Sequence, residues 1–346
     1  ASNEDWSANL ADLNVASGAT FNGVEANVRV DALNGDGTVR SGDDGAGYSA
    51  FTFGVDNGSG TFSGVLADTD GTNIGNFVKA GTGTQILSGA NTFTGTTTIS
   101  GGSASIINDA TFAFNRSDDY QFNSVISGTG TVTQSGAGTL TLTGANTYTG
   151  VTTISDGTLS INADSGLGTA PGSATAGHIT LDGSTLATNA SFSLDANRGI
   201  ALNSSGGTFD VADATTLSYG GIIAGSGNFI KLGTGTQILS GANTYTGTTT
   251  ISGGTLLINA DSGLGTAPGS ATAGHLALDG GTLATNATFS LNANRGLTLS
   301  ASGGTFDIAE ATTLSYGGII AGSGDFTKLG TGTQILSGAN TYTGAT

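Results

Sequence analysis

Hydrophobic residues recur along this chain in short bursts, alternate with polar residues, and are separated by turn residues. Stretches such as TLTL, TLSI and TQIL place an apolar side chain at every second position, which is the pattern of a β-strand with one buried face. Between residues 136 and 232 such bursts follow one another roughly every eight residues, a spacing too short for β/α units and typical of strands wound in successive coils.

A unit of 22 residues sets the order of these bursts. It reads GTGTQILSGANTYTGTTTISGG from Gly233 to Gly254, has near copies at Gly81–Gly102 and Gly136–Gly157, and begins again at Gly330. The last three starts are 97 residues apart (233−136 and 330−233), and the first two are 55 apart (136−81). A period that repeats in this way predicts a repeat architecture.

The two repeat lengths favour a solenoid. With about three strands per coil, a 97-residue unit holds about four coils, and the short unit lacks 97−55=42 residues. A stack in which each layer touches only its neighbours tolerates such a deletion, whereas a β-sandwich of similar length, the alternative fold, would lose much of its core. We therefore predict an all-β parallel β-helix with three short strands per coil.

The repeats divide the chain into segments of one continuous solenoid. Residues 1–80 form N-terminal coils with a candidate cap or assembly end. The remaining segments are a short repeat (81–135), two long repeats (136–232 and 233–329) and an incomplete repeat (330–346).

Composition narrows the class of partner. The net charge of −17 arises from 25 acidic and 8 basic residues, so no basic patch is available for nucleic acid. Cysteine is absent, which excludes a disulfide framework and thiolate metal sites. No run of 18 apolar residues occurs, so we expect no membrane-spanning helix in this chain.

Most residues able to carry chemistry are copied with the repeat. His178 and His275 are 97 residues apart, as are two arginines and two lysines (Arg198, Arg295, Lys231, Lys328). A catalytic constellation is normally single, so we interpret these residues as structural and predict no catalytic site, cofactor or metal. The single-copy polar clusters, which we expect to be solvated loop residues with calcium binding as the alternative, are Asp36, Arg40, Asp43 and Asp44, and Arg116, Asp118 and Asp119.

Four copies of an Asn-Thr-aromatic turn complete the motif. The asparagines are Asn91, Asn146, Asn243 and Asn340, and the aromatic residues are Phe93, Tyr148, Tyr245 and Tyr342. We predict that each asparagine caps its own turn and that the aromatic ring covers the coil edge. A sugar site, with the ring as a stacking plane, is the alternative.

With its Gly-x-Gly-Thr start, its Asn-Thr-aromatic core and its Thr-Thr-x-x-x-Gly-Gly-Thr-Leu end, the unit resembles the passenger-associated transport repeats, also called autotransporter-associated β-strand repeats. Gly136 to Leu159 meets the pattern most fully, while Gln237 and Ile238 replace the usual Thr-Leu in the next copy. The resemblance covers residues 64–346 and implies a right-handed parallel β-helix in a bacterial surface protein, in a family that includes adhesins. The full form of that family ends in a membrane β-barrel, which we do not expect within these residues.

These observations predict a non-enzymatic extracellular or cell-surface protein, a β-helical stalk or adhesin. The chain stops within a repeat unit, so we expect head-to-tail filaments, with cell-surface or matrix glycans as further partners. The predicted assembly ends are Trp6, Leu10, Leu13 and Val15, and Ile335, Leu336 and Tyr342. The alternative function is a polysaccharide-binding or polysaccharide-cleaving β-helix. An ice-binding solenoid is disfavoured by the irregular spacing of the Thr-x-Thr pairs.

Overall fold

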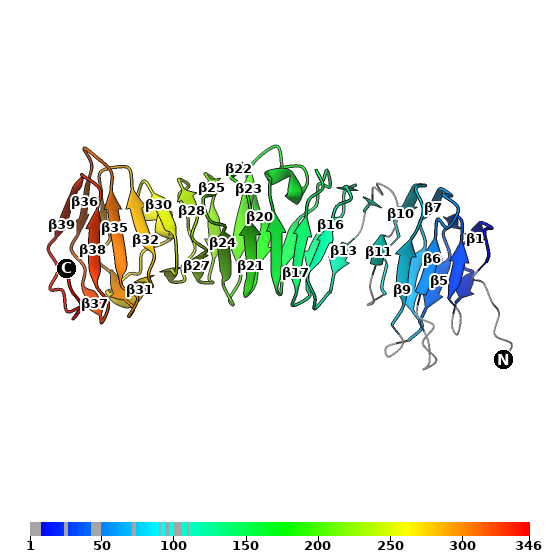
Figure 1. Cartoon of the computed structure of the whole chain (residues 1–346), viewed down its shortest axis with the longest axis horizontal. Coiled ribbons are helices and arrows are strands. Elements are labelled where there is room, and N and C mark those ends of the chain that lie inside the picture. Colours follow the sequence, from blue (N-terminus) through cyan, green and yellow to red (C-terminus); the bar gives the residue numbers. More distant parts are fainter. Residues whose placement is uncertain are drawn as a thin grey trace. The chain divides into compact units, whose positions relative to one another are not determined.

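The computed structural model describes residues 8–23, 27–42, 50–70, 74–89, 91–93, 97–99, 106–108 and 111–346. The chain forms two compact units. Unit 1 comprises Ala1–Gly138, Thr143–Gly150 and Leu167–Thr169, and unit 2 comprises Thr139–Leu142, Val151–Gly166 and Ala170–Thr346. Figure 1 shows that each is built from short strands stacked side by side.

Unit 1 contains three parallel stacks in its first part. The strands are, in stack order, β1 (Leu13–Val15), β4 (Leu33–Gly35), β7 (Gly60–Phe62) and β10 (Gln85–Leu87); β2 (Thr20–Asn22), β5 (Thr38–Ser41) and β8 (Val65–Asp68); and β3 (Val28–Val30), β6 (Ala50–Phe53), β9 (Asn76–Lys79) and β11 (Thr97–Ile99). Further along follow β12 (Ile106–Ile107), β13 (Thr111–Phe114), β14 (Tyr120–Phe122), β15 (Ile126–Ser127) and β16 (Thr131–Gln134), in which β12 pairs with β15 and β13 with β16.

Unit 2 has three faces, and from β21 onward the chain visits them in the fixed order II, III, I. Face I contains β18 (Thr152–Ile154), β20 (Thr175–Leu181), β23 (Arg198–Leu202) and β26 (Ile223–Gly225), and, after two strand-free segments, β33 (Phe289–Leu291), β36 (Thr313–Tyr316) and β39 (Thr333–Leu336). Face II contains β17 (Thr139–Leu142), β19 (Thr158–Ile161), β21 (Ser184–Thr188), β24 (Gly207–Val211), β27 (Phe229–Leu232), β29 (Thr249–Ile251), β31 (Thr272–Leu278), β34 (Arg295–Leu299) and β37 (Ile320–Gly322). Face III contains β22 (Phe192–Leu194), β25 (Thr216–Tyr219), β28 (Thr236–Leu239), β30 (Thr255–Ile258), β32 (Thr282–Thr285), β35 (Gly304–Ile308) and β38 (Phe326–Leu329).

The strand-free segments of face I still stack as coils. Thr244 donates its backbone N–H to the Ile223 carbonyl at 2.8 Å, and Thr266 donates to the Tyr245 carbonyl at 2.8 Å. They therefore continue the inter-coil ladder from β26 toward β33. Two short 3-10 helices, η1 (Asp164–Leu167) and η2 (Asp261–Leu264), precede the strands that open the long coils.

The pairing is parallel and in register, which confirms the predicted parallel β-solenoid with three strands per coil. On face III, for example, Leu217 pairs with Gln237 and Gln237 with Leu256. Inward and outward side chains alternate along each strand, as in the buried-outside pattern of β28 and β30. Stacked inward residues such as Leu256 and Leu283, both fully buried, supply the apolar core.

Glycine is required at corners where the backbone turns sharply. Gly206 and Gly254 have φ of 82° and 55°, a region that residues with a Cβ avoid. A Cβ on Gly254 would lie 2.3 Å from the Gly235 carbonyl oxygen of the preceding coil. The paired glycines of the sequence thus permit both the turn and the close approach of two coils.

Candidate functional site

The asparagine of the turn motif binds neighbouring coils. In Asn243 the side-chain oxygen accepts a hydrogen bond from the Ile223 N–H at 2.9 Å, and the side-chain nitrogen donates to the Gly263 carbonyl at 2.9 Å. Asn243 therefore joins three successive coils. The side-chain oxygens of the other three asparagines accept the same hydrogen bond from the preceding coil: Asn91 from the Leu66 N–H, Asn146 from the Ile126 N–H and Asn340 from the Ile320 N–H. The prediction that each asparagine caps its own turn is wrong, because the stacked coil brings these donors within reach.

The tyrosines that follow lie inside the stack. Tyr148 and Tyr245 are both 0% exposed. The Tyr245 hydroxyl lies 2.7 Å from Thr249 Oγ1, its ring stacks on Phe229 with centroids 5.8 Å apart, and burial raises its pKa. Neither ring can offer a stacking plane to a sugar, and neither covers an outer edge as expected.

A buried arginine fastens each long repeat. Arg295 is 1% exposed, and its guanidinium forms a two-point contact with the Asp261 carboxylate at 3.0 and 3.1 Å. It also donates to the carbonyls of Leu264 at 2.8 Å and Gly265 at 2.5 Å. Arg198 repeats the carboxylate contact with Asp164 at 2.9 and 3.0 Å. The arginine thus pins the 3-10 helix of the long coil to the following coil.

Both histidines are buried. His275 is 4% exposed, and its Nδ1 lies 3.5 Å from the Arg295 guanidinium. Burial, and then the charge of Arg295, lower the pKa of His275, so its neutral form is favoured. The two arginines and His275 therefore pack within the solenoid.

A buried amine, that of Lys231, occupies a coil corner in the first long repeat. The Lys231 side chain is 0% exposed and donates to the carbonyls of Leu232 and Gly233 at 2.6 and 2.9 Å. Burial lowers its pKa to about 8, and Asp210 opposes that shift. In the short repeat Gln134 occupies the equivalent position and donates to the carbonyls of Gly136 and Gly138 at 2.8 and 3.0 Å. The corner therefore needs a donor and does not need a charge.

Gln237 is a core residue whose role sequence reasoning missed. It is 0% exposed, between Leu217 and Leu256 in the inward column, and neither its amide nitrogen nor its oxygen has a hydrogen-bond partner within the described chain. The signal was present in the alternation of TQIL, where Gln237 falls at an inward position that Leu140 occupies in the preceding copy.

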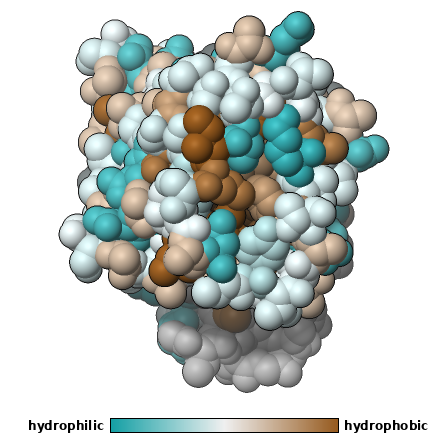
Figure 2. Space-filling view, turned by 90° about the vertical axis from the view of Figure 1, so that its left-hand side faces the viewer, coloured by the Kyte–Doolittle hydropathy of each residue, from teal (hydrophilic) through white to brown (hydrophobic). Residues whose placement is uncertain are grey.

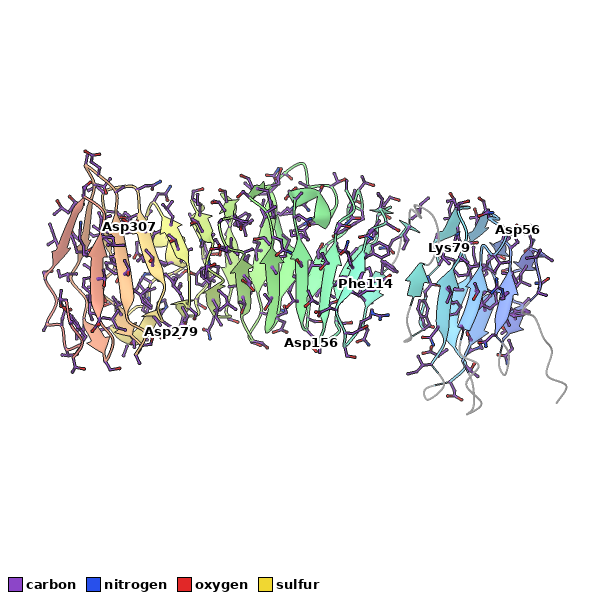
Figure 3. All side chains as sticks on the ribbon, viewed as in Figure 1. Asp56, Lys79, Phe114, Asp156, Asp279 and Asp307 are labelled. Carbon is purple, nitrogen blue, oxygen red and sulfur yellow. The ribbon has the colours of Figure 1, made fainter. Side chains whose placement is uncertain are left out.

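The acidic residues do not converge on a site. Asp118 is mostly exposed and pairs with Arg116 at 2.7 Å, while Arg40 donates to the carbonyls of Asp68 and Thr69. Asp43 and Asp44 lie outside the described residues. In unit 2, Figure 3 shows Asp156, Asp279 and Asp307 on separate strands and turns. Over the part of the chain that the structure describes, no group of three or more acidic or histidine side chains is placed to hold a metal ion.

Outward threonines align on face III despite their uneven spacing in sequence. Six of them pair in register from β25 to β38: Thr216, Thr236, Thr255, Thr282, Thr305 and Thr327. The spacing argument against an ice-binding solenoid is therefore wrong, because coils of different length place threonine at the same height of the strand. The next outward position on these strands is occupied by residues such as Ile238, Leu257 and Asp307. These strands therefore do not carry the second row of threonines that a flat Thr-x-Thr surface would need.

The residues predicted as assembly ends differ in exposure. Leu10 is 59% exposed and Ile335 is 47% exposed, whereas Val15 is buried at 4%. Figure 2 shows apolar side chains gathered on the end of unit 2, where β39 pairs only with β36. Tyr342 is partly exposed, with its hydroxyl 2.5 Å from Thr346 Oγ1. Trp6 lies outside the described residues.

These features define a β-solenoid repeat protein whose turn asparagines and buried arginines link neighbouring coils. The passenger-associated-transport-repeat family matches residues 77–103, 132–161, 229–258 and 326–346. The chain therefore carries passenger-associated transport repeats, as the resemblance predicted.

A segment of 150 residues is 42% identical to the protein called "Adhesin BmaC autotransporter" of Brucella suis biovar 1 (strain 1330). The match covers 41% of this chain and 4% of that adhesin. No match to the chain was found among solved structures. In the described residues no helix is long and apolar enough to cross a membrane.

Proposed function

We propose that this chain is a segment of a non-enzymatic bacterial surface adhesin, in which the β-solenoid forms a stalk that presents binding surfaces outside the cell. The observation that carries the proposal is the use of the repeat itself. Its asparagines and buried arginines make contacts between coils, so the repeat serves to extend a ladder. An extended ladder with exposed faces is what a stalk requires.

The similarity to an adhesin supports the same proposal. The matched segment is a small part of that protein, so adhesion by this chain depends on the properties of its own surface. That surface is acidic overall, which disfavours nucleic acid and anionic membranes as targets. Uncharged glycans and proteins of a cell surface or matrix are the partners that fit.

Adhesion is tested with the purified chain. Fluorescently labelled protein, incubated with cultured epithelial cells, should bind saturably and be displaced by unlabelled protein, as measured by flow cytometry. Pretreatment of the cells with glycosidases separates glycan from protein targets. Absence of saturable binding by a folded sample would overturn the adhesin proposal.

The enzymatic alternative requires acids that converge. General acid and base groups that cleave a glycosidic bond lie within about 10 Å of each other on one surface, and the acids described above are dispersed. Incubation with acidic and neutral polysaccharides, followed by measurement of reducing ends, should give no product above a buffer control. Repeated turnover by the purified chain would replace the adhesin proposal with a polysaccharide-cleaving one.

We also propose end-to-end self-association. Leu329 and Ile335 are 52% and 47% exposed, and Figure 2 shows apolar side chains gathered on the end of unit 2. A strand of another copy can pair with an exposed strand edge. The coil containing Leu10 and Leu13 of a second copy is the proposed cover. Sizing across a range of concentrations and electron micrographs should reveal chains of copies that Ile335→Lys abolishes. A monomer at high concentration would contradict this assembly.

A further inference from the structure

Equivalent strands of successive repeats lie on different faces of unit 2. The strand that follows the Gly-x-Gly-Thr start is β17 on face II in one repeat, β28 on face III in the next, and β39 on face I in the last. All three have the pattern Thr-x-x-Leu. One sequence element thus occupies each of the three faces in turn.

The cause is the number of strand places in a long repeat. From β28 to β39 the chain passes 39−28=11 strands, and the strand-free segments at Thr244 and Thr266 fill two further places in the ladder of face I. With three strand places per coil, thirteen places make four and one third coils. A long repeat therefore ends one face further round than it began.

The same step recurs for every motif pair in unit 2. β18 lies on face I and its copy β29 on face II, β19 on face II and β30 on face III, and β26 on face I and β37 on face II. The step is thus a property of the whole repeat, and it is independent of local irregularity such as the register shift within β31.

Surface features follow the step. Ile222 and Ile319 are equivalent residues, 47% and 49% exposed. Each borders a small cavity, of about 190 and 400 Å³ respectively, lined by equivalent alanines and glycines. The first cavity lies over β20, β23 and β26 of face I, and the second over β31, β34 and β37 of face II. Equivalent surfaces therefore face directions that differ by a third of a turn.

We propose that the long repeat is an angular step, which presents a repeat-borne surface successively in three directions because each following repeat begins one face further round. A flat partner that lies along the solenoid reaches only one copy of such a surface, because the next copy points away from it. Copies on different faces are free to engage separate partner molecules, so the chain is built to bridge several partners instead of lining up sites for one. Multivalent binding to one rigid partner needs sites that can be engaged together, and the step prevents this for adjacent repeats.

The proposal is tested by distances between spin labels in the intact chain. The protein contains no cysteine, so pairs of cysteines introduced at outward positions are the only labelling sites. Thr216 and Thr305 lie on face III four strands apart, which corresponds to about 19 Å at the usual strand spacing. Thr208 and Thr305 are 97 residues apart and lie on faces II and III.

With the angular step, the Thr208→Cys/Thr305→Cys pair gives a longer distance than the Thr216→Cys/Thr305→Cys pair, because its labels point away from different faces. With a whole number of coils per repeat, Thr208 and Thr305 share one face, and the order of the two distances reverses. A reversed order overturns the proposal. A second set of pairs checks that the result does not depend on one local irregularity. It compares the Thr139→Cys/Ile230→Cys pair, with both labels on face II, with the Thr139→Cys/Thr236→Cys pair, with labels on faces II and III. The measurement involves no partner, so its outcome is separate from that of the adhesion assay.

Discussion

At the scale of single residues, the clearest weak point is the amide of Gln237 in the core. A buried polar group without a hydrogen bond costs roughly 1–3 kcal/mol, and Gln237 is such a group. The preceding copy of the repeat fills the position with Leu140. The sequence therefore contains its own better-packed solution.

Gln237→Leu is expected to raise the free energy of unfolding by about 1–3 kcal/mol, as measured by denaturant unfolding followed by circular dichroism. Gln85→Leu is the matched control, since Gln85 accepts a hydrogen bond from the Leu33 N–H at 3.1 Å and donates to its carbonyl at 2.7 Å. The control should lose stability. Equal effects of the two substitutions would show that the Gln237 amide has a partner.

The Lys231 amine gives a pH dependence at the same scale. Its pKa of about 8 in the fold lies below the unfolded value of about 10.5, so the unfolded chain holds the proton more tightly. The contribution of Lys231 to stability is therefore lowest below pH 8 and rises between pH 8 and 10.5, by up to about 3 kcal/mol.

Lys231→Gln should remove this rise while keeping a donor at the corner, as Gln134 does in the short repeat. The difference in unfolding free energy between parent and variant, measured at several pH values from 7 to 10, is the readout. A difference that stays constant over this range would mean that the amine keeps an ordinary pKa in the fold.

At the scale of elements, the ion pair between Arg295 and Asp261 holds the 3-10 helix η2 against β34. Asp261→Ala leaves the Arg295 guanidinium buried without its carboxylate, a change that typically costs about 3–5 kcal/mol. Hydrogen exchange should increase first around η2 and β34, which this ion pair joins. Asp118→Ala removes an exposed ion pair and should leave exchange unchanged. Protection of η2 that survives in Asp261→Ala would assign its stability to the Leu264 and Gly265 contacts.

The alternation within strands allows a second test at this scale, on adjacent residues. Leu256 is fully buried and Leu257 points outward. Leu256→Asp should destabilise unit 2 by more than about 3 kcal/mol, because it buries a charge without a partner, while Leu257→Asp should be tolerated. Thermal melts that rank the two variants equally would contradict the assigned inward and outward faces.

At the scale of the whole molecule, the period of the sequence was sufficient to predict a parallel solenoid, because repeat lengths of 97 and 55 are compatible with removable coils and not with a sandwich core. The step of one face per repeat was not predictable. It depends on the places of Thr244 and Thr266, which lack the alternation of a strand and become visible only through their backbone hydrogen bonds.

The candidate site shows the same division. Copying of Arg198, His178 and Lys231 along the repeat predicted that they are structural, since chemistry rarely needs several copies. The role of Asn243 was not predictable, because its partners belong to coils 20 residues before and after it. Sequence spacing alone does not reveal which coil a side chain reaches.

The offset between repeat and coil also bears on how such a chain folds correctly. Tandem copies that are almost identical, such as the 18 unchanged residues at 161–178 and 258–275, are prone to exchange and misassembly. Here a strand stacks on the strand three places away, whereas its copy lies thirteen places away, so identical strands do not stack on one another. Each strand therefore meets neighbours of different sequence, and a slipped ladder would break the contacts that Asn243 and Arg295 make with other coils. Dissimilar neighbours specify the register that identical ones would leave ambiguous.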